Sequence, residues 1–185
     1  LEYKGTVEIK HMLWVLLEDV GADALKARIT KPLSDLKTAP FYGCYIVRPT
    51  NVLGFDENPN RQQSLEQLIE LVGAEVVDFP GKTKCCGFPI LTINENASLK
   101  MVANHTGDAQ ELGADIMVTP CPLCHLNLDG FQPRAASKNK KKIELPILHL
   151  PQLIGLALGL DPKALGVKRH IVSPKKALAG LGIRM

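Results

Sequence analysis

The chain has 185 residues, which is enough to bury one good hydrophobic core and favours one domain with an appendage over two full domains. Its 22 basic and 19 acidic residues leave a formal charge of +3, too small for the basic footprint of a nucleic-acid-binding protein. No stretch approaches the roughly 18 apolar residues of a membrane span, since even residues 145–160 are interrupted by prolines and polar side chains. We expect a cytoplasmic protein; the start at Leu1 leaves room for a missing amino-terminal part.

The first 36 residues are predicted to be a helical lead-in. Apolar side chains from Met12 to Val20 recur on one helical face, and the same spacing continues until Pro32 interrupts it. We interpret residues 1–36 as an inter-domain segment and residues 37–185 as one cysteine-rich domain.

Strands and helices then alternate. Residues 38–42 are predicted to be a strand that ends shortly before Cys44, and Ser64 with Gln67 forms a capping-box signature for a helix that ends at Gly73. Residues 74–79 form the next strand and lead toward a vicinal pair of cysteines. The chain is therefore expected to place its first two cysteine groups after two strands.

The sequence pattern around Gly73 is repeated around Gly113: in both places a helix end is followed by a glycine, an acidic residue and an apolar strand. A helix over residues 95–112 precedes this second strand, and Cys121 follows it. Residues 138–142 are predicted to be a solvated basic loop, residues 145–150 a last strand and residues 151–158 a helix.

This alternation predicts an α/β fold with a mostly parallel sheet flanked by helices. Sites in such sheets lie beyond the carboxyl ends of the strands. Each cysteine group follows a predicted strand, so three segments that are distant in sequence should meet at one edge of the sheet. The chain's five cysteines are Cys44, Cys85, Cys86, Cys121 and Cys124.

Several kinds of site are compatible with some of these cysteines. Cys121, Cys124 and His125 match the attachment signature of c-type haem, and the same cysteines match a thioredoxin-like dithiol, but both leave three cysteines unexplained. A structural zinc ion takes four ligands and would leave one cysteine idle. An iron–sulfur cluster spreads several irons over a few ångströms, so adjacent thiolates can each reach a metal. Five cysteines with a vicinal pair favour the cluster over zinc.

Three motifs resemble the cysteine-rich CCG domain found in the B subunit of heterodisulfide reductase. They are Tyr-Gly-Cys at residues 42–44 with Val-Arg-Pro at 47–49, the run 79–87 that ends in Cys-Cys-Gly, and the run 119–129 that begins Thr-Pro-Cys-Pro-Leu-Cys-His. Residues 11–21 are similar to the family's inter-domain segment, and residues 152–162 and 170–174 to its carboxyl terminus. The likeness covers nearly the whole chain and matches the carboxyl-terminal half of such a protein.

The resemblance implies that the five cysteines bind a noncubane 4Fe-4S cluster. In the family, two such domains face each other and present two clusters to the two sulfurs of a disulfide. Electrons arrive through a ferredoxin-like iron–sulfur subunit that is fed by a flavin subunit. One set of five cysteines is present here, so either an amino-terminal CCG domain lies outside this sequence or the protein works with one cluster. We expect the second holder of the disulfide to come from outside this chain.

Other residues have weaker claims. Arg48 could steer an anionic substrate or serve as an ion-pair partner, and His149 could donate a proton to a departing thiolate or be a satisfied, partly buried histidine. His125 could line the pocket or support a ligand from behind. Gly87 is expected to let the backbone turn and offer N–H groups to sulfur. Phe88 and Pro89 are bulkier than the family pattern and could narrow access to the cluster.

Three functions remain open at this point. The first is a subunit of a heterodisulfide-reductase-like oxidoreductase that acts on a disulfide or thiol substrate and is inactive as this chain alone. The second is an electron-relay subunit of the kind found with fumarate reductases, succinate dehydrogenases, and glycolate or lactate oxidases. The third is a zinc-stabilised interaction domain without catalysis.

Overall fold

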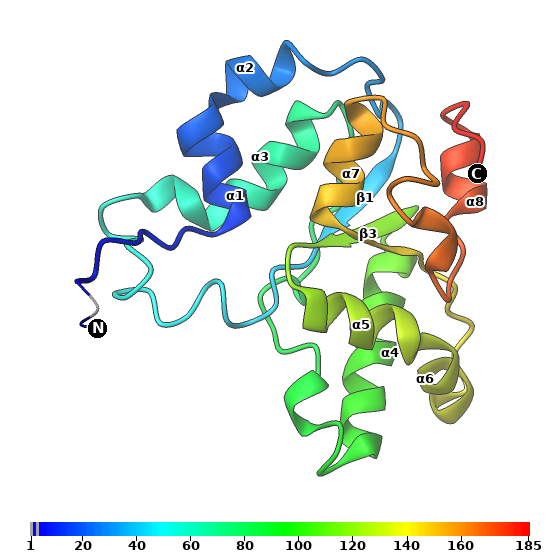
Figure 1. Cartoon of the computed structure of the whole chain (residues 1–185). Helices are drawn as coiled ribbons and strands as arrows, with labels where there is room; N and C mark the ends of the chain where they lie inside the picture. The colour runs from blue at the N-terminus through cyan, green and yellow to red at the C-terminus, as the bar shows by residue number, and fades with distance from the viewer. Residues whose placement is uncertain (1, 3) are drawn as a thin grey trace.

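The computed structural model describes residue 2 and residues 4–185, and these residues form a four-stranded sheet with helices on both faces (Figure 1). The strand order is β2-β1-β3-β4, and every neighbouring pair is parallel. The strands are β1 (Lys37–Pro40), β2 (Glu75–Val76), β3 (Ile116–Thr119) and β4 (Ile147–His149). The predicted α/β class with a parallel sheet is confirmed.

Helices follow or precede each strand. The α-helices are α1 (Met12–Trp14), α2 (Ala22–Lys26), α3 (Ser64–Leu71), α4 (Glu95–Glu111), α5 (Pro122–Gly130), α6 (Gln132–Asn139), α7 (Leu150–Ala157) and α8 (Lys175–Ala179). Other helix types are the π-helical segment η1 (Val15–Gly21) and the 3-10 turns η2 (Pro59–Gln63), η3 (Phe88–Ile90) and η4 (Val167–Arg169).

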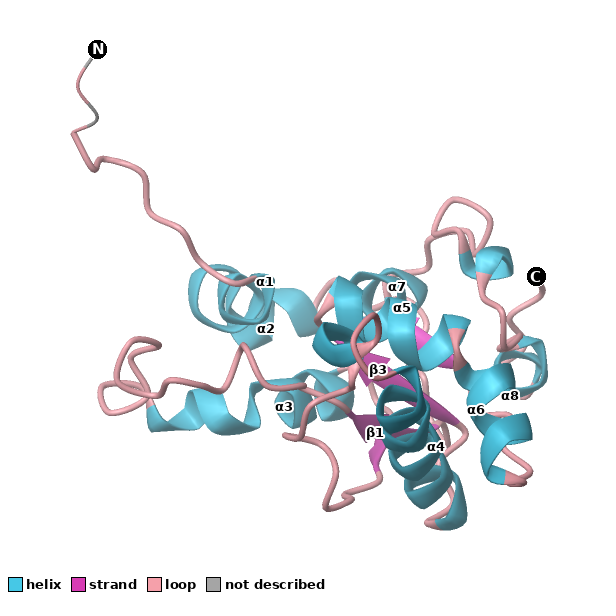
Figure 2. Ribbon diagram, turned by 90° about the horizontal axis from the view of Figure 1, so that it is seen from below, coloured by secondary structure: helices cyan, strands magenta, loops and turns pink. Residues whose placement is uncertain are grey.

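The sheet separates two hydrophobic cores, because successive strand residues point to opposite faces. Ile116, Val118 and Leu148 point to one face, while Met117 and Ile147 point to the other. The first face is covered by α1, α2, α3 and α7, and we call its packing the α3/α7 core. The second is covered by α4, α5 and α6 (Figure 2), and we call its packing the α4/α5 core.

The lead-in is helical over a shorter range than predicted. Helical backbone runs from Met12 through η1 to Lys26, and residues 29–36 contain no helix. Thr30 and Lys31 instead donate their N–H groups to the carbonyl of Ala157, which ties this segment to α7. Leu13 and Leu25 are buried in the α3/α7 core, so the lead-in packs against the sheet domain. The domain boundary at residue 36 stays a prediction.

The predicted capping box at Ser64 is wrong, although the helix does begin there. The Ser64 hydroxyl donates to the carbonyl of Arg61 rather than accepting from the first turn of α3. The cause is η2, whose turn runs directly into α3 and already occupies the backbone groups that a cap would satisfy.

The repeated sequence pattern describes two equivalent helix ends. Gly73 and Gly113 both have positive φ, at 86° and 90°, which favours glycine. After each glycine the next N–H reaches back into the helix, from Ala74 to Ile69 and from Ala114 to Ala109. The two glycine stops are as predicted.

The carboxyl-terminal part holds more helix than the sequence predicts. The basic run at residues 138–142 is not entirely loop, because its first two residues close α6, and Lys140 caps that helix with φ at 52°. Neither α5 nor α8 has a counterpart among the predicted helices and strands. Asp129 of α5 accepts N–H bonds from Ile171 and Val172 at 2.8 and 3.0 Å, which holds the chain end against the domain.

Candidate metal centre

The three cysteine groups meet at the carboxyl edge of the sheet, as the strand order requires. β1 lies between β2 and β3, so the segment that carries Cys44 lies between the other two. The thiol of Cys44 contacts that of Cys85, Cys86 contacts Cys124, and Cys124 also contacts Cys121. The five thiols from three segments therefore form two groups of contacts, one of two thiols and one of three, and the adjacent residues Cys85 and Cys86 link the groups.

Backbone bonds join the first two segments directly. Tyr42 and Gly43 both donate their N–H groups to the carbonyl of Lys82, at 2.8 and 3.3 Å. The Tyr42 hydroxyl is bonded to Glu66 and accepts from the N–H of Leu65 at 2.9 Å, and burial raises the pKa of this phenol. The loop that begins with Cys44 is thus anchored to both α3 and the loop that leads to the vicinal pair.

Gly43 makes room for a sulfur of the third segment. A Cβ atom at this position would lie 2.7 Å from Sγ of Cys124, and φ of Gly43 is 74°. Any residue with a Cβ atom at this position would therefore require the backbone or Cys124 to move. The glycine before Cys44 is therefore part of the geometry that brings Cys124 close.

The vicinal pair is followed by the tight turn expected at Gly87. Gly87 has φ at 94°, and its N–H donates to Sγ of Cys85 at 3.4 Å. The next N–H, that of Phe88, donates to Sγ of Cys86 at 3.5 Å. Backbone N–H groups directed at sulfur favour the thiolate form that binds metals.

The thiols affect one another's protonation. Contact with Cys124 and the N–H groups at the start of α5 lower the pKa of Cys121 to about 6, against the opposing effect of burial. Contact with Cys124 likewise lowers the pKa of Cys86, whereas its contacts with Cys121 and Cys86 raise the pKa of Cys124. Burial, together with Cys85, raises the pKa of Cys44.

The donor set suits a group with several metal ions. Two adjacent thiols reach different partners, Cys44 and Cys124, so they approach the site from two sides. In the part of the chain that the structure describes, no three His, Cys, Asp or Glu side chains are placed to hold one metal ion. The residues present fit a group with several metal ions, since adjacent thiolates that diverge in this way would each reach a different metal.

His125 lies on α5, and its ring points toward β4. Its Nε2 donates to the carbonyl of Ile147 at 3.1 Å, and its ring centroid lies 5.0 Å from that of His170. Burial, reinforced by His170, lowers the pKa of His125. The structure therefore places His125 behind Cys124, as a link between α5 and the sheet.

His149 lies at the same edge of the sheet, at the end of β4. Its Nε2 donates to the carbonyl of Pro120 at 3.2 Å, beside Cys121, and burial lowers its pKa. A neutral ring whose N–H is bonded to a carbonyl has no free proton for a departing thiolate. The predicted role as proton donor is therefore not supported by this geometry, and the satisfied histidine fits better.

Arg48 is exposed on the loop that follows Cys44. Among the described residues it takes part in no ion pair, so the alternative of a structural ion-pair partner finds no support.

Sequence reasoning missed two buried polar residues beside the vicinal pair. His105 of α4 and Asn127 of α5 contact the carbonyls of Cys85 and Cys86. Asn127 lies within the run 119–129 that supports the family resemblance. No other feature of the sequence indicates that this residue belongs to the site. His105 had no such signal, because its partner lies 20 residues away across the fold.

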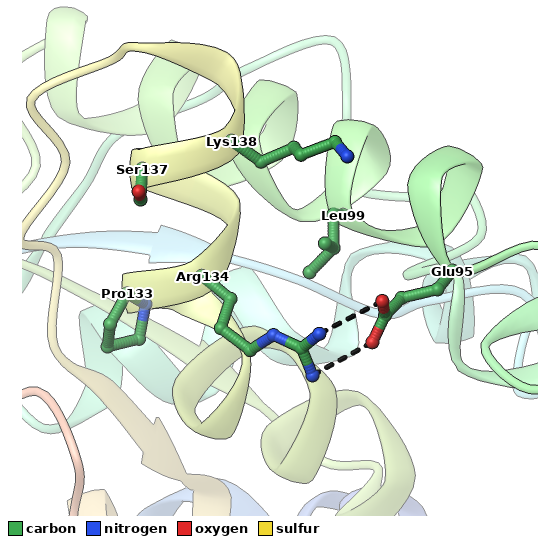
Figure 3. Close-up of a pocket in the computed structure, with 6 residues that line it drawn as sticks. All are labelled: Glu95, Leu99, Pro133, Arg134, Ser137 and Lys138. Carbon is green, nitrogen blue, oxygen red and sulfur yellow. Dashed lines mark hydrogen bonds and ion pairs between the residues drawn. The ribbon is translucent and has the colours of Figure 1, made fainter.

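Two cavities of the structure lie away from the thiols. One, of about 400 Å³, lies between α4 and α6 beneath the ion pair of Glu95 with Arg134 (Figure 3). The other, of about 1220 Å³, opens at the amino edge of the sheet between residues 34–36, residues 142–146 and the carboxyl-terminal segment. Neither cavity is lined by a cysteine, so the candidate metal centre is the place where the thiols converge.

Comparison with known proteins agrees with the cysteine pattern. Residues 38–129 match the family model described as the cysteine-rich domain CCG. A crystal structure of a hypothetical protein from Helicobacter pylori superimposes with a TM-score of 0.61 at 16% identity, covering 82% of this chain and 28% of that one. At this identity the likeness concerns the fold alone.

Three curated relatives are similar over most of the chain. The 8-methylmenaquinol:fumarate reductase membrane anchor subunit of Wolinella succinogenes is 41% identical over 95% of this chain and 61% of that protein. The B subunit of the ferredoxin/F420H2-dependent CoB-CoM heterodisulfide reductase of Methanosarcina acetivorans is 36% identical over 97% of this chain and 60% of that protein. A protein of Archaeoglobus profundus, named for its likeness to the heterodisulfide reductase B subunit, is 34% identical over 87% and 55%.

The chain thus spans about 60% of the length of the first of these relatives. No helix in the described residues is long and apolar enough to cross a membrane. With the family model matched around all five cysteines and with these relatives, the chain belongs to the CCG cysteine-rich family and is related to the B subunit of heterodisulfide reductase.

Proposed function

We propose that this chain is the cluster-binding subunit of a heterodisulfide-reductase-like complex. Its five cysteines would hold a noncubane 4Fe-4S cluster used for electron transfer and for disulfide or thiol redox chemistry. The observation that carries the proposal is the convergence of all five cysteines from three separate segments, in two groups of thiol contacts that the vicinal pair links into one site. The names of the Methanosarcina and Archaeoglobus relatives support the same class of reaction.

When bound, such a cluster would accept and release single electrons and offer an iron to a substrate sulfur. The chain's own residues hold and orient this group. The N–H groups of Gly87 and Phe88 stabilise negative charge on two of the sulfurs. We further propose that the exposed guanidinium of Arg48 attracts anionic substrates toward the edge that carries Cys44.

The partners we propose are a ferredoxin-like iron–sulfur subunit, a flavin subunit and a second CCG domain. A disulfide has two sulfurs, and each must be held when the bond is split to avoid release of a radical. The printed sequence supplies one set of five cysteines. The second holder therefore comes from outside this sequence, and the isolated chain should not turn over a heterodisulfide.

Metal analysis of chain purified without air tests the proposal. We expect about four irons and four labile sulfides per chain, the content of a 4Fe-4S cluster. The Cys86→Ser variant should change the paramagnetic resonance spectrum, because both vicinal thiols are proposed ligands. One zinc per chain with no iron after reconstitution would overturn the cluster and favour the zinc-stabilised domain.

A second function is favoured by the relative with 41% identity, whose name is that of a fumarate reductase subunit. In that case the same cluster would only relay electrons between a flavin partner and a carrier. Addition of a coenzyme thiol to the oxidised, cluster-loaded chain separates the two functions. A changed resonance spectrum supports binding of a substrate sulfur, and an unchanged spectrum favours the relay.

A further inference from the structure

The two carbonyl groups of the vicinal cysteines are each bonded to a buried side chain from a different helix. The carbonyl of Cys85 lies 2.9 Å from Nε2 of His105 in α4. The carbonyl of Cys86 lies 2.8 Å from Nδ2 of Asn127 in α5. Because a carbonyl oxygen only accepts, Nε2 of His105 carries the hydrogen and the Asn127 amide presents its nitrogen.

These bonds satisfy carbonyl groups that regular secondary structure cannot reach at this place. The vicinal pair lies in a loop, between β2 and η3, where the turn at Gly87 interrupts any ladder of backbone bonds. A buried carbonyl without a partner costs free energy comparable to a lost hydrogen bond. His105 is 7% exposed and Asn127 is fully buried, so water does not readily replace either side chain.

Both side chains are themselves held from several sides. The His105 ring packs against Phe41 with a centroid distance of 5.2 Å, and a Cβ on Gly81 would lie 2.7 Å from Nδ1 of His105. Asn127 also reaches Oγ of Ser98 at 3.4 Å, and Ser98 packs against Gly87. The two helices and the turn therefore form a rigid frame around the loop.

The Asn127 amide holds this position at a cost. Its Oδ1 is buried and has no hydrogen-bond partner among the described residues. An unpaired buried oxygen is unfavourable, so the bond from Nδ2 to Cys86 is made although the other half of the amide gains nothing. Packing alone would be served better by an apolar side chain of similar size.

The consequence is a fixed divergence of two adjacent thiols. Cys85 extends toward Cys44, whereas Cys86 extends inward toward Cys124 and is only 3% exposed. Rotation of either peptide plane would move one sulfur away from its partner. We propose that His105 and Asn127 are positioning residues that clamp the two carbonyls of the vicinal pair and so aim its thiols at opposite sides of one site. That this site holds a cluster rests on the proposed function above, but the clamp belongs to the chain itself.

Thiol reactivity in the reduced, metal-free, full-length chain tests the clamp. The variants are His105→Leu and Asn127→Asp, which remove the donors, and His105→Gln, which restores a nitrogen donor near Nε2. We expect iodoacetamide to alkylate Cys86 about tenfold faster in the first two variants, the scale for loss of one buried hydrogen bond, and His105→Gln to return toward the wild-type rate. Peptide mass spectrometry measures the rate at each cysteine.

Gln132→Leu is the matched control. Gln132 is a fully buried amide on the neighbouring helix α6. Its Nε2 donates to the carbonyls of Leu128 and Leu145, and its Oε1 accepts from the N–H of Leu145. This variant should lose stability and leave the Cys86 rate within about twofold of wild type, since its bonds do not reach the loop. Equal rates of Cys86 alkylation in folded wild type, His105→Leu and Asn127→Asp would overturn the proposal.

A measurement on the wild-type chain covers the case in which these variants do not fold. Long-range proton–nitrogen spectra of the metal-free protein should show His105 with its hydrogen on Nε2, and the Nδ1 tautomer would overturn the clamp. The proposed function fails separately. If wild type binds no iron yet the alkylation differences are present, the clamp stands and the cluster does not; if iron binds and the differences are absent, the reverse holds.

Discussion

The two faces of the sheet share the same strands but carry different kinds of side chain. The α3/α7 core consists of aliphatic and aromatic residues. The α4/α5 core includes the two buried thiols, Cys86 and Cys124, and its helices bring His105 and Asn127 to the vicinal pair. The comparison indicates that one face mainly stabilises the fold while the other shapes the thiol site. Substitutions on the two faces should therefore have separable effects.

The largest effect on stability should come from the first face. Leu148 is fully buried in the α3/α7 core, and Leu148→Ala should lower the free energy of unfolding by about 3 kcal/mol through lost burial and a residual cavity. Urea denaturation of the metal-free chain measures this. The alkylation rate of Cys86 in the folded variant should equal that of wild type, and a faster rate would contradict the separation of the two faces.

Gly43→Ala should have the next largest effect and should act on the site. The substitution adds strain at positive φ, about 1–2 kcal/mol, and brings Cβ to 2.7 Å from Sγ of Cys124. We expect the free energy of unfolding to fall by about 1–2 kcal/mol. The iron content after anaerobic reconstitution should also be lower than that of wild type.

Gly113→Ala controls for the backbone strain of that substitution. Gly113 has φ at 90°, and no other atom lies within 4 Å of an added Cβ. This variant should lose about 1–2 kcal/mol and keep its full iron content. If both variants kept their iron, close approach of Cys124 to Gly43 would not matter for the site.

A smaller effect is expected from pH, through His149 at the edge that carries the thiols. Burial lowers its folded pKa, so below about pH 6.5 the unfolded chain takes up the proton first. The free energy of unfolding should be highest above about pH 6.5 and should fall as the pH drops through that value toward the folded pKa. Urea titrations of the metal-free chain at several pH values measure this slope, and His149→Gln should make it shallower. An unchanged slope would mean that His149 titrates alike in both states.

The smallest effect belongs to the exposed pair of Glu95 with Arg134, which joins α4 to α6 (Figure 3). A double-mutant cycle with Glu95→Gln and Arg134→Gln should give a coupling of about 0.5 kcal/mol or less, weaker still in high salt. A coupling well above this would show that the α4/α5 face depends on its surface charges as well as on its core.

The sequence predicts the convergence of the cysteines well, because it depends on topology alone. Cys44, Cys85 and Cys121 each follow a strand, and parallel strands end at one edge. The glycine stops at Gly73 and Gly113 are equally legible, since positive φ requires a special residue. These features follow from local chemistry and from a general rule of α/β folds.

The features that the sequence does not reveal depend on contacts between distant residues. The cap expected at Ser64 is displaced by a turn whose own sequence, around Pro59, gives no strong signal. In the sequence, His105 cannot be distinguished from other polar residues of a helix. Its role becomes visible only in the fold, where its Nε2 lies 2.9 Å from the carbonyl oxygen of Cys85. The partner of His149 is hidden from the sequence in the same way, because it is the carbonyl of Pro120 in another segment.

The parallel order of the strands also governs when the site can come into being. β1 pairs Thr38 with Ile116, and β3 pairs Met117 with Ile147, so the sheet closes only after residues near the end of the domain are available. Such long-range pairings form slowly. During synthesis the thiols of Cys44, Cys85 and Cys86 are therefore made before Cys121 and Cys124, and before the edge of the sheet that gathers them can close. A newly made chain therefore passes through a stage in which its first three thiols are present but the sheet edge that gathers all five does not yet exist.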